Sequence, residues 1–149
     1  MDFPITDLLE HEASTNWVQE HFHPDGLYCP HCQADVDNAR AFRTTKRSQL
    51  TVYRCHCCQG IYNLYSGTVF EGRHLRPAQV VLLIRGVCQG KSAAQIAREL
   101  AVSRTTATDL RHLLQANAER LQPNTPLSDN VTETDEMFQN AGEKRGRTP

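Results

Sequence analysis

The sequence lacks any apolar run long enough to cross a lipid bilayer. Its longest strongly apolar run, "VVLLI", covers only residues 80–84, whereas a transmembrane helix needs about 20 such residues. The N-terminus, "MDFPITDLLEHEAS", has neither the basic start nor the apolar stretch of a secretory signal peptide. We therefore expect a cytoplasmic protein with no membrane partner.

The sequence also has little net charge, because oppositely charged segments cancel. Residues 1–40 carry a net charge of −7, residues 41–120 carry +8 and residues 121–149 carry −2. A basic block between acidic flanks suits a surface that binds a polyanion, although ordinary solvated surfaces also carry charge runs. The hydrophobic content of 39% excludes a wholly disordered chain and predicts a modest core.

Local patterns divide the chain into four segments. Apolar residues at helical spacing predict one or two short helices in segment 1–26. In segment 27–70, stretches rich in Thr, Tyr, Phe and Val ("AFRTTKR", "LTVYRC", "IYNLYSGT") predict three short antiparallel strands. Segment 71–121 has helical patterns again, and segment 122–149 has the Pro-, Asn- and Ser-rich composition of a linker.

Three helices are predicted in segment 71–121. Pro77 suits the first turn of a helix that ends near Gly90, and Ser92 with Gln95 forms a capping box for the second. Ser103 can cap the third. Cys88 is expected in the core, on the apolar side of the first helix. The buried stripe of the third helix is expected to be Leu110, Leu113, Leu114, Ala118 and Leu121.

Two CxxC pairs, "CPHC" and "CHCC", indicate a metal site. Two intervening residues let a tight turn aim both sulfurs at one ion, and two pairs supply the four thiolates of a tetrahedral zinc (Zn²⁺) site. Such a closed site is structural, so folding should depend on the metal. The alternatives are two disulfides or a redox CxxC, both less common in a reducing compartment.

The second pair leaves some choice of ligands. Cys57, His31 and His56 lie within the pairs and could replace a ligand, but adjacent Cys57 and Cys58 cannot both keep ideal turn geometry with Cys55. The expected ligands are Cys29, Cys32, Cys55 and Cys58.

The second and third predicted helices fit a helix-turn-helix, in which the N-terminal polar residues of a supported helix enter the major groove of DNA. Arginine can read guanine, and threonine can contact phosphate or a thymine methyl group. The candidate DNA-contacting residues there are Arg104, Thr105, Thr106, Thr108 and Arg111. Further candidates for phosphate contacts are Arg43, Lys46, Arg47 and Arg54. A helical hairpin that serves only for packing shares this periodicity.

Four segments in order, "CPHC...YRCHCC", "GTVFEG", "SAAQIARELAVSRTTA" and "TETDEMFQNAGEK", resemble the N-terminal half of IS1595-type (ISXO2-like) insertion-sequence transposases. The resemblance covers residues 27–145. It implies that the zinc ribbon and helix-turn-helix bind double-stranded DNA at transposon ends. It also implies an RNase H-like DDE domain that cuts and joins strands with two divalent ions, such as Mg²⁺, in a complete transposase.

The resemblance makes Asp135 the first catalytic carboxylate; otherwise Asp135 is a solvated acid in a linker. The sequence departs from the family pattern at Gln33, where such ribbons commonly have glycine, and it stops 14 residues after Asp135. We therefore expect a truncated beginning of the DDE domain. A lone carboxylate cannot hold two metal ions, so the chain alone is expected neither to cleave nor to join DNA, and its status as an enzyme is open.

The sequence thus predicts a small α+β fold: a zinc ribbon of three short antiparallel strands, a helix-turn-helix unit and the truncated start of an RNase H-like DDE domain. The expected function is DNA binding as the N-terminal portion of a transposase. A stand-alone zinc-ribbon and helix-turn-helix transcriptional regulator is one alternative, although it has no use for "TETDEMFQNAGEK". A zinc-stabilised protein-interaction module is the other, and self-association is left open.

Overall fold

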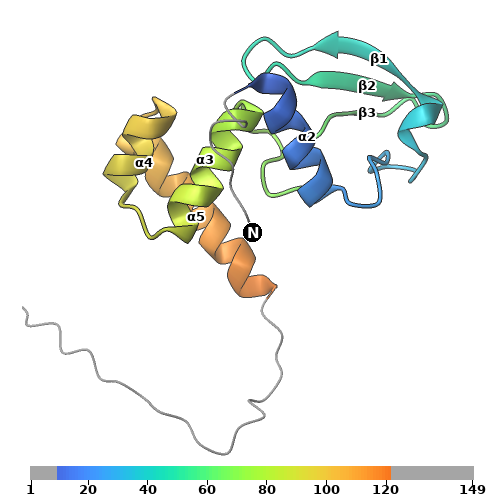
Figure 1. Ribbon diagram of the computed structural model, residues 1–149. Helices are drawn as coiled ribbons and strands as arrows, with labels where there is room; N and C mark the ends of the chain where they lie inside the picture. Colours follow the sequence, from blue (N-terminus) through green and yellow to red (C-terminus); the bar gives the residue numbers. More distant parts are fainter. Residues whose placement is uncertain (1–9, 122–149) are drawn as a thin grey trace, which may run out of the picture.

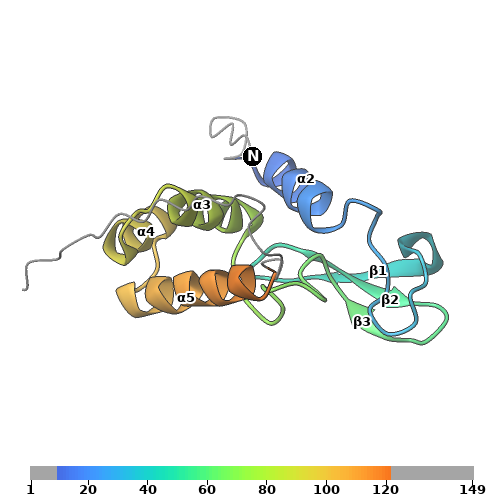
Figure 2. The same cartoon turned by 90° about the horizontal axis from the view of Figure 1, so that it is seen from below.

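A computed structural model describes residues 10–121, in which a small sheet and a group of helices lie at opposite ends (Figure 1). The elements in chain order are α2 (His11–Phe22), the short 3-10 helix η1 (Val36–Asn38), β1 (Ala39–Thr44), β2 (Thr51–Cys55), β3 (Ile61–Tyr62), α3 (Pro77–Cys88), α4 (Ala93–Leu100) and α5 (Arg104–Arg120). Helix α2 packs beside α3, between the sheet and the other helices (Figures 1 and 2). This is a small α+β fold, as predicted.

Two predicted features fall outside the described span. Residues 122–149, with Asp135 and the expected start of a DDE domain, are not among the described residues, and neither are residues 1–9. Within residues 10–121, no helix combines the length and the apolar character needed to cross a bilayer.

The sheet is antiparallel with strand order β1-β2-β3. Strand β1 pairs with β2 through a β-bulge between Ala41 and Arg43. Strand β3 is only two residues long and therefore shorter than its sequence pattern predicts. The Asn63 side chain accepts a hydrogen bond from the Tyr65 N–H at 2.9 Å. This local bond makes a turn directly after Tyr62 and ends the strand.

The three helices after the sheet begin where their capping residues predict. The Ser92 hydroxyl accepts the Gln95 N–H, and the Gln95 side chain accepts the Ser92 N–H at 3.0 Å, which completes the capping box of α4. The Ser103 hydroxyl accepts the Thr106 N–H at 3.1 Å and caps α5. Only residues 101–103 separate α4 from α5, with Ala101 in the left-handed region at φ 54°.

The buried side chains form two separate cores. The larger contains fifteen buried residues from α2, the segment between β3 and α3, and α3 to α5, together with Leu50 of the β1–β2 turn, and Phe70, Val80 and Ile96 are fully buried. The smaller lies inside the sheet unit and contains only Leu27, Cys29, Cys55 and Tyr62 as buried members. Two of these four are predicted metal ligands, so the small core and the candidate metal site are one structure.

Two expectations about the helical core are wrong. Cys88 is exposed, because α3 ends at this residue and Val87 takes the position that packs against the core. On α5, Leu110 is buried, but Ala118 is exposed and Leu121 is 75% exposed. Helix α5 has 17 residues and α4 only 8, so α4 is too short to cover the C-terminal part of α5.

Candidate metal centre

The two CxxC turns are built alike. In the first, the Gln33 N–H donates to the Cys29 carbonyl at 2.8 Å, and the Cys29 N–H donates to the Ala34 carbonyl at 2.9 Å. The second turn, residues 55–60, repeats both bonds at the equivalent positions, at 3.1 and 2.9 Å. Two copies of one hydrogen-bonded turn therefore present their cysteines to the same point from different parts of the chain.

The four predicted ligands converge. Their sulfur atoms all lie within 4.8 Å of one another. Across the two turns, Cys29 Sγ lies 3.5 Å from Cys58 Sγ, and Cys32 Sγ lies 3.5 Å from Cys55 Sγ. A regular tetrahedron with metal–sulfur bonds of about 2.3 Å has sulfur–sulfur edges of about 3.8 Å. The four cysteines are therefore positioned to hold one metal ion.

The other candidate ligands lie outside this group. The cluster contains the four cysteines without His31, His56 or Cys57. His31 packs over the second turn, since a Cβ added to Gly60 would lie 2.5 Å from His31 Cδ2. The same Cβ would lie 3.1 Å from Cys58 Sγ. A residue without a side chain is therefore required at position 60 if both groups are to keep their places.

The position after each CxxC pair has an unusual backbone conformation. Gln33 and Gln59 both adopt the left-handed region, at φ 62° and 61°. Glycine adopts this conformation at no steric cost, whereas a residue with a side chain is strained there. The geometry gives a physical reason for glycine at this position in similar ribbons, and it shows that Gln33 accepts the same turn.

The thiols perturb one another's ionisation. The Cys58 N–H, helped by the Cys57 N–H, outweighs burial and lowers the pKa of Cys55 to about 6. The Gly60 N–H lowers the pKa of Cys58, but hydrogen bonding with Cys29 and burial outweigh it and raise that pKa to about 12. The Cys55 thiol thus ionises readily, and its negative charge opposes ionisation of the Cys58 thiol. A divalent cation removes this repulsion and favours all the thiolates together.

A strand arginine next to the metal centre is occupied by an aromatic contact. The Arg54 guanidinium lies 4.2 Å from the centre of the Phe42 ring, in the geometry of a cation–π contact. Arg54 is half-buried, and its Nε has no hydrogen-bond partner among the described residues. Of the basic residues predicted to contact phosphate, Arg54 therefore lies half-buried against Phe42, whereas Arg43, Lys46 and Arg47 are exposed near the β1–β2 turn.

The predicted contact residues of α5 differ in their surroundings. Arg104, Thr105 and Thr106 are exposed, and Thr108 and Arg111 are half-buried. The Thr106 hydroxyl lies 2.8 Å from the Ser103 hydroxyl, and the Thr108 hydroxyl donates to the Arg104 carbonyl at 2.9 Å. The side chains of Arg104 and Thr105 make no such bond within residues 10–121, so they are free to contact a ligand.

Sequence reasoning missed two exposed residues, Arg73 and His74, in the segment between β3 and α3. Both line a surface hollow of about 370 Å³ that reaches Thr106 of α5. His74 also lines a neighbouring hollow of about 400 Å³ beside the β1–β2 turn. Both residues belong to the basic block of the sequence, which was the available signal, but they lie in none of the motifs that suggested DNA contact.

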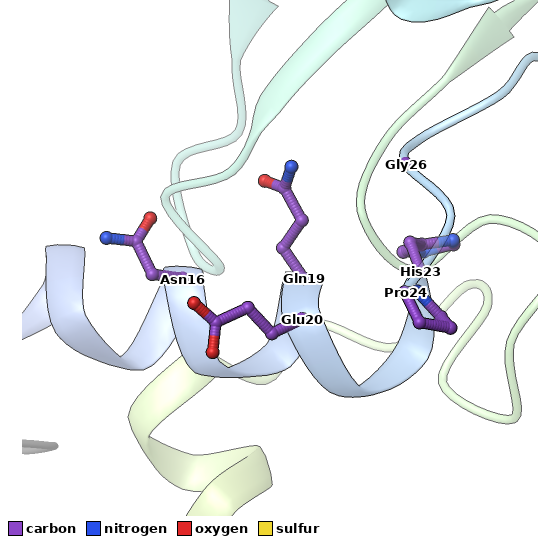
Figure 3. A pocket seen from close by; sticks show the side chains of 6 residues that line it. All are labelled: Asn16, Gln19, Glu20, His23, Pro24 and Gly26. Carbon is purple, nitrogen blue, oxygen red and sulfur yellow. The ribbon is translucent and has the colours of Figure 1, made fainter.

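A third hollow, of about 270 Å³, lies at the C-terminal end of α2 (Figure 3). Its lining residues are Asn16, Gln19, Glu20, His23, Pro24 and Gly26. His23 Nε2 is hydrogen-bonded to the Leu64 carbonyl at 2.8 Å. This contact ties the end of α2 to the segment that follows β3, so His23 has a structural role at the junction of the two cores.

The chain matches no family model, no curated protein and no solved structure in the comparisons made.

Proposed function

We propose that the chain is a zinc-stapled module that binds double-stranded DNA. The observation that carries this proposal is the exposed start of α5, where the side chains of Arg104 and Thr105 have no hydrogen-bond partner among the described residues. The rest of α5's first turns is anchored, because Ala107 and Leu110 are buried against the core. A rigid helix that offers a free arginine and threonine at its N-terminal end suits insertion into the major groove.

The surroundings of α5 support a helix-turn-helix. Helices α4 and α5 pack together, and α3 packs against both. The Gln79 side-chain amide of α3 donates to the Leu100 carbonyl at the end of α4 at 2.8 Å. The short turn and this cross-link fix the angle at which α5 leaves the bundle. A fixed recognition helix loses little conformational entropy when it binds.

The unpaired basic charge supports a polyanionic ligand. Among residues 10–121 the one ion pair joins Lys91 and Glu99, so the remaining described lysines and arginines lack a carboxylate partner. Such charge destabilises the free protein slightly through mutual repulsion and is relieved when phosphates bind. Helices that served only for packing would gain nothing from this unpaired basic charge.

Zinc is the metal that best suits the cysteine cluster. Four thiolates at tetrahedral spacing are typical ligands of structural zinc, although iron–sulfur proteins use the same donor atoms. When bound, zinc would supply folding free energy and a fixed geometry. It would not supply a catalytic water, because four protein ligands leave no open position. A cytoplasmic location, where thiols stay reduced, suits this role.

The finer proposal is that the module is the DNA-binding portion of an IS1595-type transposase. It is supported by the order of the four sequence segments and by the place of "GTVFEG", whose Phe70 is fully buried in the core between the sheet and the helices. In this proposal Asp135 is the first carboxylate of a magnesium-dependent DDE site. Preference for transposon ends over promoter DNA distinguishes this proposal from a stand-alone transcriptional regulator.

The test measures bound zinc and the Kd for labelled duplex DNA, with transposon ends and unrelated sequences compared at two salt concentrations. We expect one zinc per chain and salt-dependent binding that Arg104→Gln weakens by about 1–3 kcal/mol. The matched control is Arg120→Gln, which removes the same charge at the other end of α5. A chain that binds zinc but no DNA at any salt concentration would overturn the proposal and favour a protein-interaction role.

A further inference from the structure

The hollows beside the β1–β2 turn and beside α5 share two lining residues, Arg47 and His74. They are therefore adjoining parts of one depression, which we call the basic cleft. The part beside the turn is lined by Arg43, Thr44, Thr45, Lys46, Arg47 and His74. The part beside α5 is lined by Arg47, Gly72, Arg73, His74, Leu75, Gln79, Val102, Thr106 and Leu110.

Every charged residue that lines the basic cleft is basic. Its charged lining residues are Arg43, Lys46, Arg47 and Arg73, and neither part is lined by a carboxylate. The acid nearest in sequence to these four cations, Glu71, has its carboxylate engaged by the Gly67 N–H at 2.9 Å. Four cations from two separate segments of the chain thus line one depression without a counter-ion from residues 10–121.

The walls of the cleft are held in place by hydrogen bonds and packing. In the β1–β2 turn, the Thr45 hydroxyl accepts the Leu50 N–H at 2.9 Å, and the Gln49 N–H donates to the Thr45 carbonyl at 3.0 Å. On the other wall, Leu75 is buried next to His74, and its carbonyl accepts the Tyr65 hydroxyl at 2.8 Å. The segments that carry Lys46, Arg47, Arg73 and His74 are therefore fixed before any ligand arrives.

We infer that the basic cleft holds the phosphodiester backbone of the same DNA duplex that α5 contacts. The inference rests on the proposed function and assigns phosphate contacts to Arg73 and His74, with Arg47 at the junction of the two parts. The end of the cleft at Thr106 adjoins the exposed start of α5. A backbone that follows the cleft therefore leads to the helix that enters the groove.

This arrangement gives the metal-stapled sheet a direct role in binding. Strand β1 and the turn after it contribute Arg43, Lys46 and Arg47, while the helices contribute the groove-reading residues. Contacts to phosphate fix the register and orientation of a protein on DNA but carry no sequence information themselves. The cleft would thus supply affinity and orientation, and α5 would supply sequence preference.

The test uses the full zinc-loaded chain and a labelled random-sequence duplex of about 30 base pairs, with Kd measured between about 50 and 200 mM salt. The cleft variant combines Arg47→Gln, Arg73→Gln and His74→Gln, all at exposed positions. The control variant combines Arg40→Gln and Arg120→Gln, which are exposed cations that do not line the cleft. Zinc content and the circular dichroism of both variants establish that they fold.

The cleft variant removes two arginine charges and should therefore lose about two units of the slope of log K against log salt, since each neutralised phosphate contributes about 0.9. Its affinity near 150 mM salt should fall roughly 10- to 50-fold, with the control close to wild type. Equal slopes and Kd values for both variants would overturn the inference and leave the proposed function standing. Two results would overturn both the inference and the proposed function. One is failure of the wild-type chain to bind the duplex, and the other is binding of a polyglutamate peptide but not of the duplex.

Discussion

Removal of the metal should unfold the sheet unit and leave the helices folded. The small core has only two large buried side chains, Leu27 and Tyr62, whose burial contributes about 1.5–3 kcal/mol each. A structural zinc contributes about 10–16 kcal/mol in zinc-finger peptides. The metal therefore outweighs the apolar contacts of residues 27–62, and these residues should not stay folded without it.

The helices depend on a different core. Fifteen buried residues, most of them outside residues 27–62, form the larger cluster, and none of its members is a cysteine. Amide hydrogen exchange of the zinc-loaded and chelated chains measures the two units separately. Chelation should abolish protection in β1 and β2 and preserve it in α3 and α5. Protected strands in the chelated chain would refute the metal dependence, and simultaneous loss of protection in α3 would refute the division into two cores.

Three further predictions concern individual side chains. Tyr65→Phe leaves the buried Leu75 carbonyl without its hydroxyl donor and should cost about 1–2 kcal/mol in denaturant unfolding; an unchanged midpoint would contradict this. Gln33→Gly should keep zinc binding and stability, whereas Gln33→Val, branched at a left-handed position, should destabilise the chain by about 1–2 kcal/mol; equal stability of the two variants would be the contrary result. Zinc binds thiolates, and a free cysteine, as in the unfolded sheet unit of the metal-free chain, has a pKa of about 8.5, so zinc affinity in a chelator competition should fall as the pH falls below about 8; an affinity independent of pH would exclude thiolate ligation.

The features that follow from local chemistry were predictable from the sequence. Ser92, Gln95 and Ser103 set the starts of two helices through bonds within a single turn, and the CxxC spacing identified the four converging cysteines. Each helix cap and each CxxC turn depends on residues a few positions apart. Their geometry is therefore nearly independent of the remaining fold.

The features that depend on distant parts of the chain were not predictable. Cys88 has the periodicity of a buried residue, but it is exposed because α3 ends there. Leu121 continues the apolar stripe of α5 beyond the reach of the shorter α4. Arg73 and His74 become candidates for phosphate contact only because the fold brings them to the β1–β2 turn. Tertiary packing decides all these cases, and one-dimensional periodicity does not contain it.

The proposal that the start of α5 and the basic cleft bind double-stranded DNA can be tested residue by residue. Its most direct test is an NMR titration of the zinc-loaded chain with duplex DNA, in which the backbone amide shifts of residues 10–121 are followed. We expect the largest shifts at Arg104 and Thr105, at residues 43–47 and at residues 73–74. Absence of shifts, or shifts confined to α2 and the C-terminal end of α5, would contradict it.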